Sequence, residues 1–269
     1  MLHLKIMKLS YILLTLNLFG ALLANSQYTL VLRNIKNITC MSIDAKGNKY
    51  LSDDAHTLYK YSSDHKLITN VNNKSYWNIT SIDCSNPFEI YVYYKDQNII
   101  VFFDNMLNIR GEVRLNNFQL NNTVCISRSY DNQIWLVDMS ENKLLKISKS
   151  GKKLMESNFL NSIHQELTNP SKIWELNGQV YVTDSTTGIV AFDIYATLDK
   201  IYPLAHFSSV TGNSTLLYAN QNGSLIRYNK LLKIPTNTNI KMPKKAKLAI
   251  HDNIVYSYFD NKILAINLP

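Results

Sequence analysis

Runs of β-branched, aliphatic and aromatic residues recur along the chain about every 40 residues, and each run ends at a polar turn. The clearest run of each repeat is centred on one large apolar residue: Tyr50, Tyr91, Trp135, Tyr181, Leu217 and Tyr256. A second apolar run follows each centre after a short polar segment, at 58–61, 99–103, 144–147, 189–192, 225–228 and 263–266. Two such runs joined by a turn predict a β-hairpin. The pattern therefore predicts six hairpins in tandem.

Additional strands flank these hairpins. A less regular apolar segment precedes the hairpin, as at 40–44 and 124–128, and an outer one follows it, as at 153–156. Units of about 40 residues with four strands each are typical of β-propeller blades. Helical periodicity beyond the N-terminus is confined to 159–167. We therefore predict an all-β fold, a six-bladed β-propeller with four-stranded antiparallel blades.

The two ends of the chain predict how the ring closes. The sixth repeat stops after its third strand, at 262–269, whereas the apolar run 28–35 precedes the first blade and fits no other blade. An N-terminal strand that completes the last blade would remove an open sheet edge. We expect residues 28–35 to close the sixth blade in this way.

Three segments carry a resemblance to a known family: Ser42–Asp53 (SIDAKGNKYLSD), Asp131–Asp138 (DNQIWLVD) and Asn177–Asp184 (NGQVYVTD). They resemble the repeats of NHL and related six-bladed propellers, and the whole chain is similar in style to exported propellers of Bacteroidota. The resemblance implies the fold over roughly residues 38–269. It implies no single activity, because this fold supports binding proteins, lactonases and lyases alike.

The N-terminus has the features of a secretory signal. Lys5 and Lys8 precede an apolar stretch at 9–23, and Ala24-Asn-Ser26 is a small-x-small cleavage pattern. We expect a signal peptide at 1–26 and a mature propeller domain at 27–269, exported to the periplasm, the outer-membrane surface or the medium and not membrane-spanning after cleavage. Loss of the two lysines lowers the formal charge from +8 to +6. The basic segment 241–247 is interpreted as a solvated loop or as a contact for a lipid headgroup or polyanionic glycan, and nucleic acid is not expected.

One candidate binding site is the position three residues after each repeat centre. In chain order it is occupied by Asp53, Tyr94, Asp138, Asp184, Asn220 and Phe259. If these side chains faced one end of the channel, the first five would form a polar rim for a ligand. Asp and Asn also begin hairpin turns for purely structural reasons, so that alternative stays open.

A second candidate consists of Asp44, Asp83 and Glu175, near the ends of the expected inner strands, together with Arg128. Lactonase-like six-bladed propellers bind a catalytic calcium ion with channel acids and amides, so the resemblance implies that these acids could serve as calcium ligands. The fifth and sixth inner strands offer no acid, and Arg128 would repel a cation.

Recognisable catalytic motifs are missing from the sequence: there is no G-x-S-x-G, no H-E-x-x-H and no C-x-x-C. Three cysteines, Cys40, Cys84 and Cys125, leave at least one thiol unpaired. The sequence therefore favours a non-enzymatic binding or scaffold propeller of the cell envelope, without a cofactor, as a monomer or in a hetero-complex. Its partner would be a protein or a glycan. The alternative is a calcium-dependent hydrolase or lyase.

Overall fold

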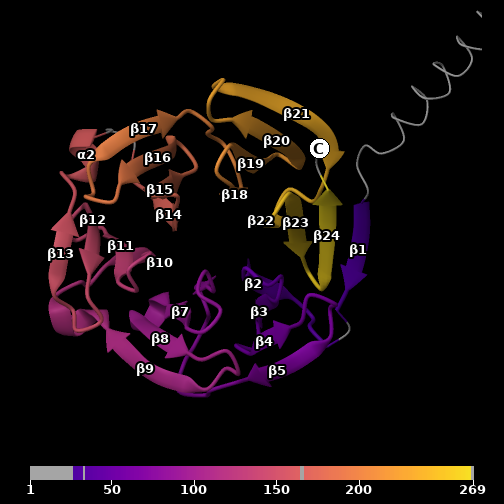
Figure 1. Cartoon of the computed structure of the whole chain (residues 1–269), viewed down its shortest axis with the longest axis horizontal. Coiled ribbons are helices and arrows are strands. Elements are labelled where there is room, and N and C mark those ends of the chain that lie inside the picture. Colours follow the sequence, from indigo (N-terminus) through magenta and orange to yellow (C-terminus); the bar gives the residue numbers. More distant parts are fainter. Residues whose placement is uncertain (1–26, 33, 164–166, 268–269) are drawn as a thin grey trace, which may run out of the picture.

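The computed structural model describes residues 27–32, 34–163 and 167–267. Within these residues the strands form six four-stranded antiparallel sheets arranged in order around a central axis (Figure 1). The predicted all-β, six-bladed propeller is thereby confirmed. The expected signal peptide at 1–26 lies outside the described residues.

Each of the first five blades consists of four consecutive strands. Blade 1 contains β2 (Ile38–Ile43), β3 (Lys49–Asp53), β4 (Leu58–Tyr61) and β5 (Leu67–Val71). Blade 2 contains β6 (Ser81–Asp83), β7 (Ile90–Tyr94), β8 (Ile99–Phe103) and β9 (Ile109–Arg114). Blade 3 contains β10 (Thr123–Arg128), β11 (Ile134–Asp138), β12 (Lys143–Ile147) and β13 (Lys153–Glu156).

Blade 4 contains β14 (Pro170–Leu176), β15 (Gln179–Asp184), β16 (Gly188–Asp193) and β17 (Leu198–Tyr202). Blade 5 contains β18 (Ser209–Gly212), β19 (Leu216–Gln221), β20 (Ser224–Asn229) and β21 (Ile234–Lys241). Short helical segments lie between strands: the 3-10 helices η2 (Lys95–Gln97) and η3 (Leu115–Phe118), and the α-helix α2 (Leu160–Ile163). α2 lies within the helix expected at 159–167, of which residues 164–166 are outside the described part.

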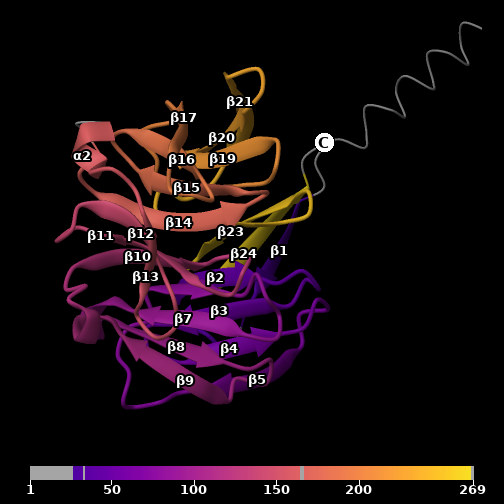
Figure 2. The same cartoon turned by 60° about the vertical axis from the view of Figure 1, so that its left-hand side comes forward.

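Blade 6 closes the ring with strands from both ends of the chain. It contains β22 (Lys247–His251), β23 (Ile254–Phe259), β24 (Lys262–Asn267) and, as its outermost strand, β1 (Gln27–Val31). β1 runs antiparallel to β24, with Gln27 opposite Ile266 and Val31 opposite Lys262 (Figures 1 and 2). The expected N-terminal closing strand is confirmed, although its ladder ends at Val31 and does not extend to Ile35.

The apolar core lies between the blades. Six clusters of buried residues are present among the described residues, and each combines side chains of two neighbouring blades. Trp135 of blade 3, for example, packs in one cluster with Val182 and Phe192 of blade 4. Both faces of β7, β8 and β11 are buried, which explains why these strands are apolar throughout rather than alternating. Each blade is therefore stabilised mainly by its neighbours.

The antiparallel order of strands gives the ring two different ends. The turns from first to second strand and from third to fourth strand of a blade lie at one end, here called the hairpin end. The connections from second to third strand and from one blade to the next lie at the other, here called the crossover end. The first strands β2, β6, β10, β14, β18 and β22 surround the central channel and all begin at the crossover end (Figure 1). We refer to them as the inner strands.

The three cysteines are all free and buried. Cys40 and Cys84 lie in the apolar cluster between blades 1 and 2, and Cys125 lies in the cluster between blades 3 and 4. No helix among the described residues is long and apolar enough to cross a membrane.

The central channel as candidate functional site

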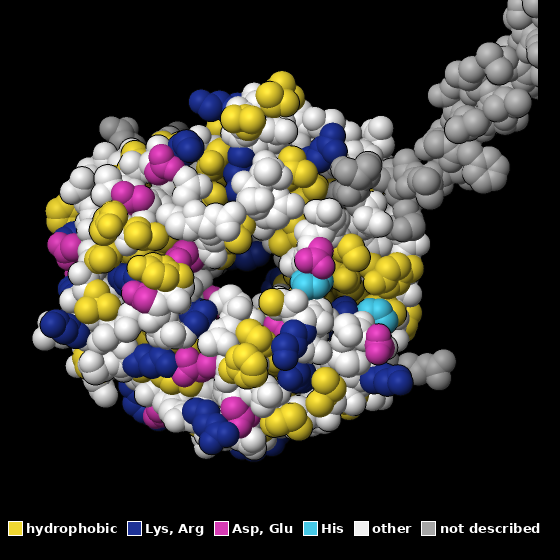
Figure 3. Space-filling view, in the orientation of Figure 1, with side chains coloured by type: hydrophobic (Ala, Val, Ile, Leu, Met, Phe, Trp, Pro, Cys, Tyr) yellow, Lys and Arg dark blue, Asp and Glu magenta, His cyan; other side chains and the backbone are white. Residues whose placement is uncertain are grey.

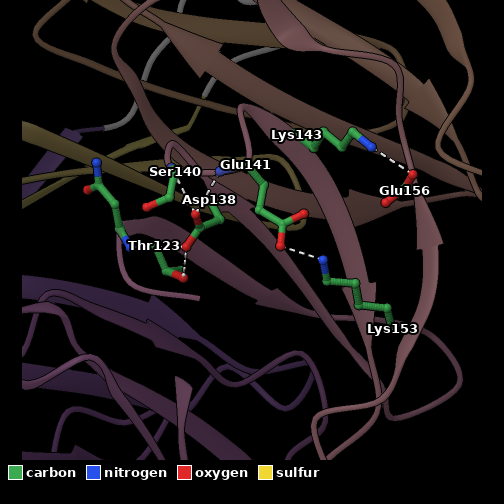
Figure 4. Close-up of polar contacts among 8 residues, drawn as sticks. Thr123, Asp138, Ser140, Glu141, Lys143, Lys153 and Glu156 are labelled. Atoms are coloured by element: carbon green, nitrogen blue, oxygen red, sulfur yellow. Dashed lines mark hydrogen bonds and ion pairs between the residues drawn. The ribbon is translucent and has the colours of Figure 1, made fainter. Parts of the chain in front are cut away.

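The polar residues expected to form a binding rim lie in the turns at the crossover end and organise them. The carboxylate of Asp53 accepts hydrogen bonds from Thr57 N at 2.8 Å and from the Tyr59 hydroxyl at 2.8 Å. Asp138 accepts from Ser140 N at 2.9 Å and from Thr123 Oγ1 at 3.0 Å (Figure 4). All of these acceptors are buried. Such carboxylates begin a turn by satisfying backbone N–H groups that would otherwise have no partner.

The other members of this set are also engaged in contacts within the protein. Asp184 accepts from Asn169 N at 2.7 Å and Thr186 N at 2.9 Å, and these contacts hold its pKa below the ordinary value despite burial, which acts to raise it. Asn220 donates to Ala246 O at 2.9 Å and so connects blades 5 and 6. Tyr94 is buried and stacks on Tyr76 with 4.8 Å between ring centroids. None of the five lines the channel cavity described below. Their role in ligand binding stays a prediction.

The three acids considered as calcium ligands point to different partners. Asp44 is buried in the first turn of blade 1, where it accepts from Lys46 N at 2.8 Å and Asn48 N at 2.9 Å. Asp83 lines the channel and accepts from the Ser127 hydroxyl and from Arg128 N, both at 2.8 Å.

Glu175 also lines the channel and contacts the neighbouring blade. It accepts from the Ser129 hydroxyl at 2.7 Å and from Trp135 Nε1 at 2.6 Å. The arrangement of these acids does not fit a calcium site, because the oxygens of Asp44, Asp83 and Glu175 are directed to N–H and O–H groups of separate turns and blades. Among the described residues, no three His, Cys, Asp or Glu side chains converge in a way that could hold a metal ion.

Hydrogen bonds join every pair of neighbouring inner strands, or the residues next to them, around the whole ring. The links are Cys40 Sγ to Thr80 O, Ser127 Oγ to Asp83, Ser129 Oγ to Glu175, Lys172 Nζ to Val210 O, Leu248 N to Ser209 Oγ, and Lys247 Nζ to Thr39 O. The last link joins residues 208 positions apart in the sequence. The channel wall is therefore one continuous hydrogen-bonded ring and not six independent strands.

This ring encloses a cavity of about 450 Å³ that runs along the axis. The channel is open at its mouth in the space-filling view (Figure 3). That volume falls within the range of about 300–1,000 Å³ typical of small-molecule sites. Much of the lining carries hydroxyl groups: Ser42, Thr80, Ser81, Ser85, Ser127, Ser171, Thr183, Ser208, Ser209 and Thr211. The Ser81 Oγ is buried and has no hydrogen-bond partner within the described structure. Hydroxyl groups can both donate to and accept from a polar ligand.

The charged residues of the cavity divide by sign between its two ends. Asp83 and Glu175 lie at or near the ends of their strands, toward the hairpin end. Lys172 and Lys247 lie near the starts of β14 and β22, toward the crossover end. The acids are covered by hydrogen bonds from blade 3, whereas neither lysine forms an ion pair with a described residue. The crossover half of the cavity is therefore electropositive.

The two lysines act on each other electrostatically. Burial, together with the nearby charge of Lys247, lowers the pKa of Lys172 to about 8. Cys40 lies in the same region, and burial raises the pKa of its thiol. Lys172 is half-buried, with its ammonium group 2.9 Å from Val210 O and 5.4 Å from the centre of the Trp174 ring. An ammonium group without a carboxylate partner at this depth favours an anionic ligand.

These lysines were not singled out as a pair from the sequence. Lys247 is the last residue of the basic segment 241–247, interpreted above as a solvated loop or as a contact for a lipid headgroup or polyanionic glycan, and Lys172 is one of many isolated lysines. A usable signal was their position at the start of an inner strand in blades 4 and 6.

Comparison with known proteins supports the fold. No protein-family model and no curated protein sequence matches this chain. A structure of streptogramin B lyase aligns with a TM-score of 0.67 at 11% identity, over 92% of this chain and 99% of that one. A catalytically inactive histidine-to-alanine variant of virginiamycin B lyase from Staphylococcus aureus with quinupristin aligns with a TM-score of 0.64 at 17% identity, over 91% and 100%.

The β-propeller domain of Cps50 (Swd1) from Myceliophteria thermophila aligns about as well, with a TM-score of 0.65 at 11% identity, over 91% of this chain and 100% of that one. At such low identity these likenesses show the β-propeller fold alone, which the chain shares with the lyases and with the Cps50 (Swd1) domain.

Proposed function

We propose that the protein is an exported, non-enzymatic binding module of the cell envelope that takes its ligand, a glycan or a side chain of a protein partner, into the central channel. The observation that carries this proposal is the cavity of about 450 Å³, lined by hydroxyl groups on a continuous ring of hydrogen-bonded strands. A rigid, preformed wall lowers the entropy that a ligand loses on binding. Export rests on the leader-like N-terminal sequence.

A substitution that fills the channel tests this proposal. Ser171 is exposed toward the cavity, so Ser171→Trp places an indole in the ligand space. Ser150→Trp is the matched control, because Ser150 is exposed in the outer turn between β12 and β13. Binding is measured on immobilised glycans and envelope peptides. The parent and the control are expected to bind the same ligands and the channel variant to lose them. Equal binding by all three, or no binding by the parent, contradicts the proposal.

The alternative function is a calcium-dependent hydrolase or lyase. Two aligned structures are lyases, and one is inactive as a histidine-to-alanine variant. In the present protein no histidine is found among the described residues that line the cavity, and the channel acids are engaged in contacts between blades. Calorimetric titration with Ca²⁺ separates the two functions. A tight isotherm in the parent that disappears when Asp44, Asp83 and Glu175 are replaced together by Asn, with the fold retained, would favour the enzyme.

A further inference from the structure

We propose that the crossover half of the channel is an oxyanion site, in which Lys172 and Lys247 bind a carboxylate or phosphate group of the ligand. This inference rests on the proposed channel-binding function and specifies the chemistry of what is bound. The two lysines reach the cavity from different blades, β14 of blade 4 and β22 of blade 6, on either side of β18. Ring closure brings them to the same end of the cavity.

The ammonium groups of Lys172 and Lys247 at the crossover end have N–H donors without a partner among the described residues. Each lysine spends one N–H bond on a backbone carbonyl, Lys172 on Val210 O at 2.9 Å and Lys247 on Thr39 O at 2.6 Å. An ammonium group has three donors, so each lysine retains donors for a ligand. These single contacts fix the stems of the side chains against the wall. An oxyanion that accepts from both ammonium groups would gain charge-assisted bonds at little entropic cost.

The surroundings favour an anion over a neutral or cationic ligand. The acids of the cavity, Asp83 and Glu175, lie toward its opposite end and are already hydrogen-bonded. Ser81, at the start of β6, adds a buried hydroxyl without a partner within the described structure. The ammonium groups of the half-buried Lys172 and the exposed Lys247 repel each other in the empty site, and an anion removes that repulsion. The lowered pKa of Lys172 agrees with this repulsion and with burial.

Three sugars of similar size distinguish the possible ligands by calorimetry. D-glucuronate supplies a carboxylate, glucose 6-phosphate a phosphate, and glucose neither. At least one of the anionic sugars is expected to bind about tenfold or more tightly than glucose, equivalent to about 1.4 kcal/mol or more. The preferred anion identifies the oxyanion class. Anionic sugars that bind no better than glucose, or not at all at millimolar concentration, would overturn the inference.

Charge-removing variants place the effect on the two lysines. Lys172→Met and Lys247→Met retain the apolar stems and are each expected to weaken binding of the anionic sugar about tenfold. Lys245→Met removes the same charge from an exposed residue that lies close by in sequence but does not line the cavity, and it is expected to change affinity less than twofold. Thermal unfolding checks that each variant is folded. If Lys172→Met and Lys245→Met bind alike, the lysine pair is not the site.

A pH series gives an independent result. The titratable groups that act on Lys172 are Cys40 and Lys247, and no carboxylate is among them. Because the anion needs the protonated amine, affinity in the parent should decline above about pH 8, well below the range of an ordinary lysine. Lys172→Met should lose this decline. Failure of the oxyanion site can be told apart from failure of the binding function. If Ser171→Trp abolishes sugar binding but both lysine variants retain it, the channel binds a ligand and has no oxyanion site.

Discussion

Removing the carboxylate of Glu175 should destabilise the whole ring. Its Oε2 accepts from the Ser129 hydroxyl at 2.7 Å and from Trp135 Nε1 at 2.6 Å, and both donor residues are fully buried. Glu175→Ala removes the acceptor of both hydrogen bonds. A hydrogen bond to a charged acceptor is worth about 1.5–3 kcal/mol, so the two together give about 3–6 kcal/mol. Because Glu175 is half-exposed to the channel, water can replace part of this loss, and we expect about 2–4 kcal/mol.

Urea denaturation followed by circular dichroism and tryptophan fluorescence measures the change in the free energy of unfolding. Glu175→Gln keeps one acceptor oxygen and should cost about 1 kcal/mol. Glu156→Ala is the control, because Glu156 forms only a surface ion pair with Lys143, worth at most about 1 kcal/mol. An unchanged dependence of the free energy on urea would show that the fold is retained. If Glu175→Ala is as stable as the control variant, the link between blades 3 and 4 contributes nothing and the reasoning is refuted.

Three further outcomes are expected. Deletion of residues 27–31 should expose the edge of β24, lower the melting temperature by several degrees and promote aggregation, as seen by calorimetry and light scattering; a variant that melts like the parent would contradict a closing role for β1. Intact mass of the natively exported protein should correspond to a chain that begins at Gln27, and a mass that includes Met1 would refute cleavage. The folded-state pKa of Lys172 is about 8, below that of the unfolded chain, so the free energy of unfolding of the parent should rise between about pH 8 and pH 10. In denaturant titrations, the extra stability of Lys172→Met relative to the parent should therefore shrink across this range. A difference that stays constant would exclude the lowered pKa.

The architecture was accessible from the sequence because it is encoded locally. Each blade repeats the same pair of apolar runs and the same polar turn, and strands are observed at the expected centres Tyr50 and Trp135, over Lys49–Asp53 and Ile134–Asp138. Ring closure followed from one missing strand and one surplus segment. The ladder of β1 is shorter than the apolar run 28–35, because the chain leaves the edge of β24 after Val31 and Ile35 packs in the core between blades 6 and 1.

The chemistry of the channel was less accessible because it depends on contacts between blades. Asp83 and Glu175 line the cavity whereas Asp44 does not, and nothing local shows that the oxygens of Asp83 and Glu175 are used by Ser127 and Trp135, some 40 residues away. The lysine pair depends on the two-residue period of a strand: a register shift by one position would direct Lys172 toward blade 3 instead of blade 5.

The closing strand has a consequence for the order in which the protein can be made. β1 is synthesised before every other strand of the described ring, but its partner β24 is synthesised last, and Thr39 must likewise wait for Lys247. Blades 1–5 can pair their strands as they emerge, each with its own neighbours in sequence. Until β24 is made, the nascent chain therefore carries an unpaired N-terminal strand, and the apolar face of blade 1 that packs against blade 6 stays uncovered. A chaperone that covers this strand and this face until β24 is released would act on a definite, short-lived species.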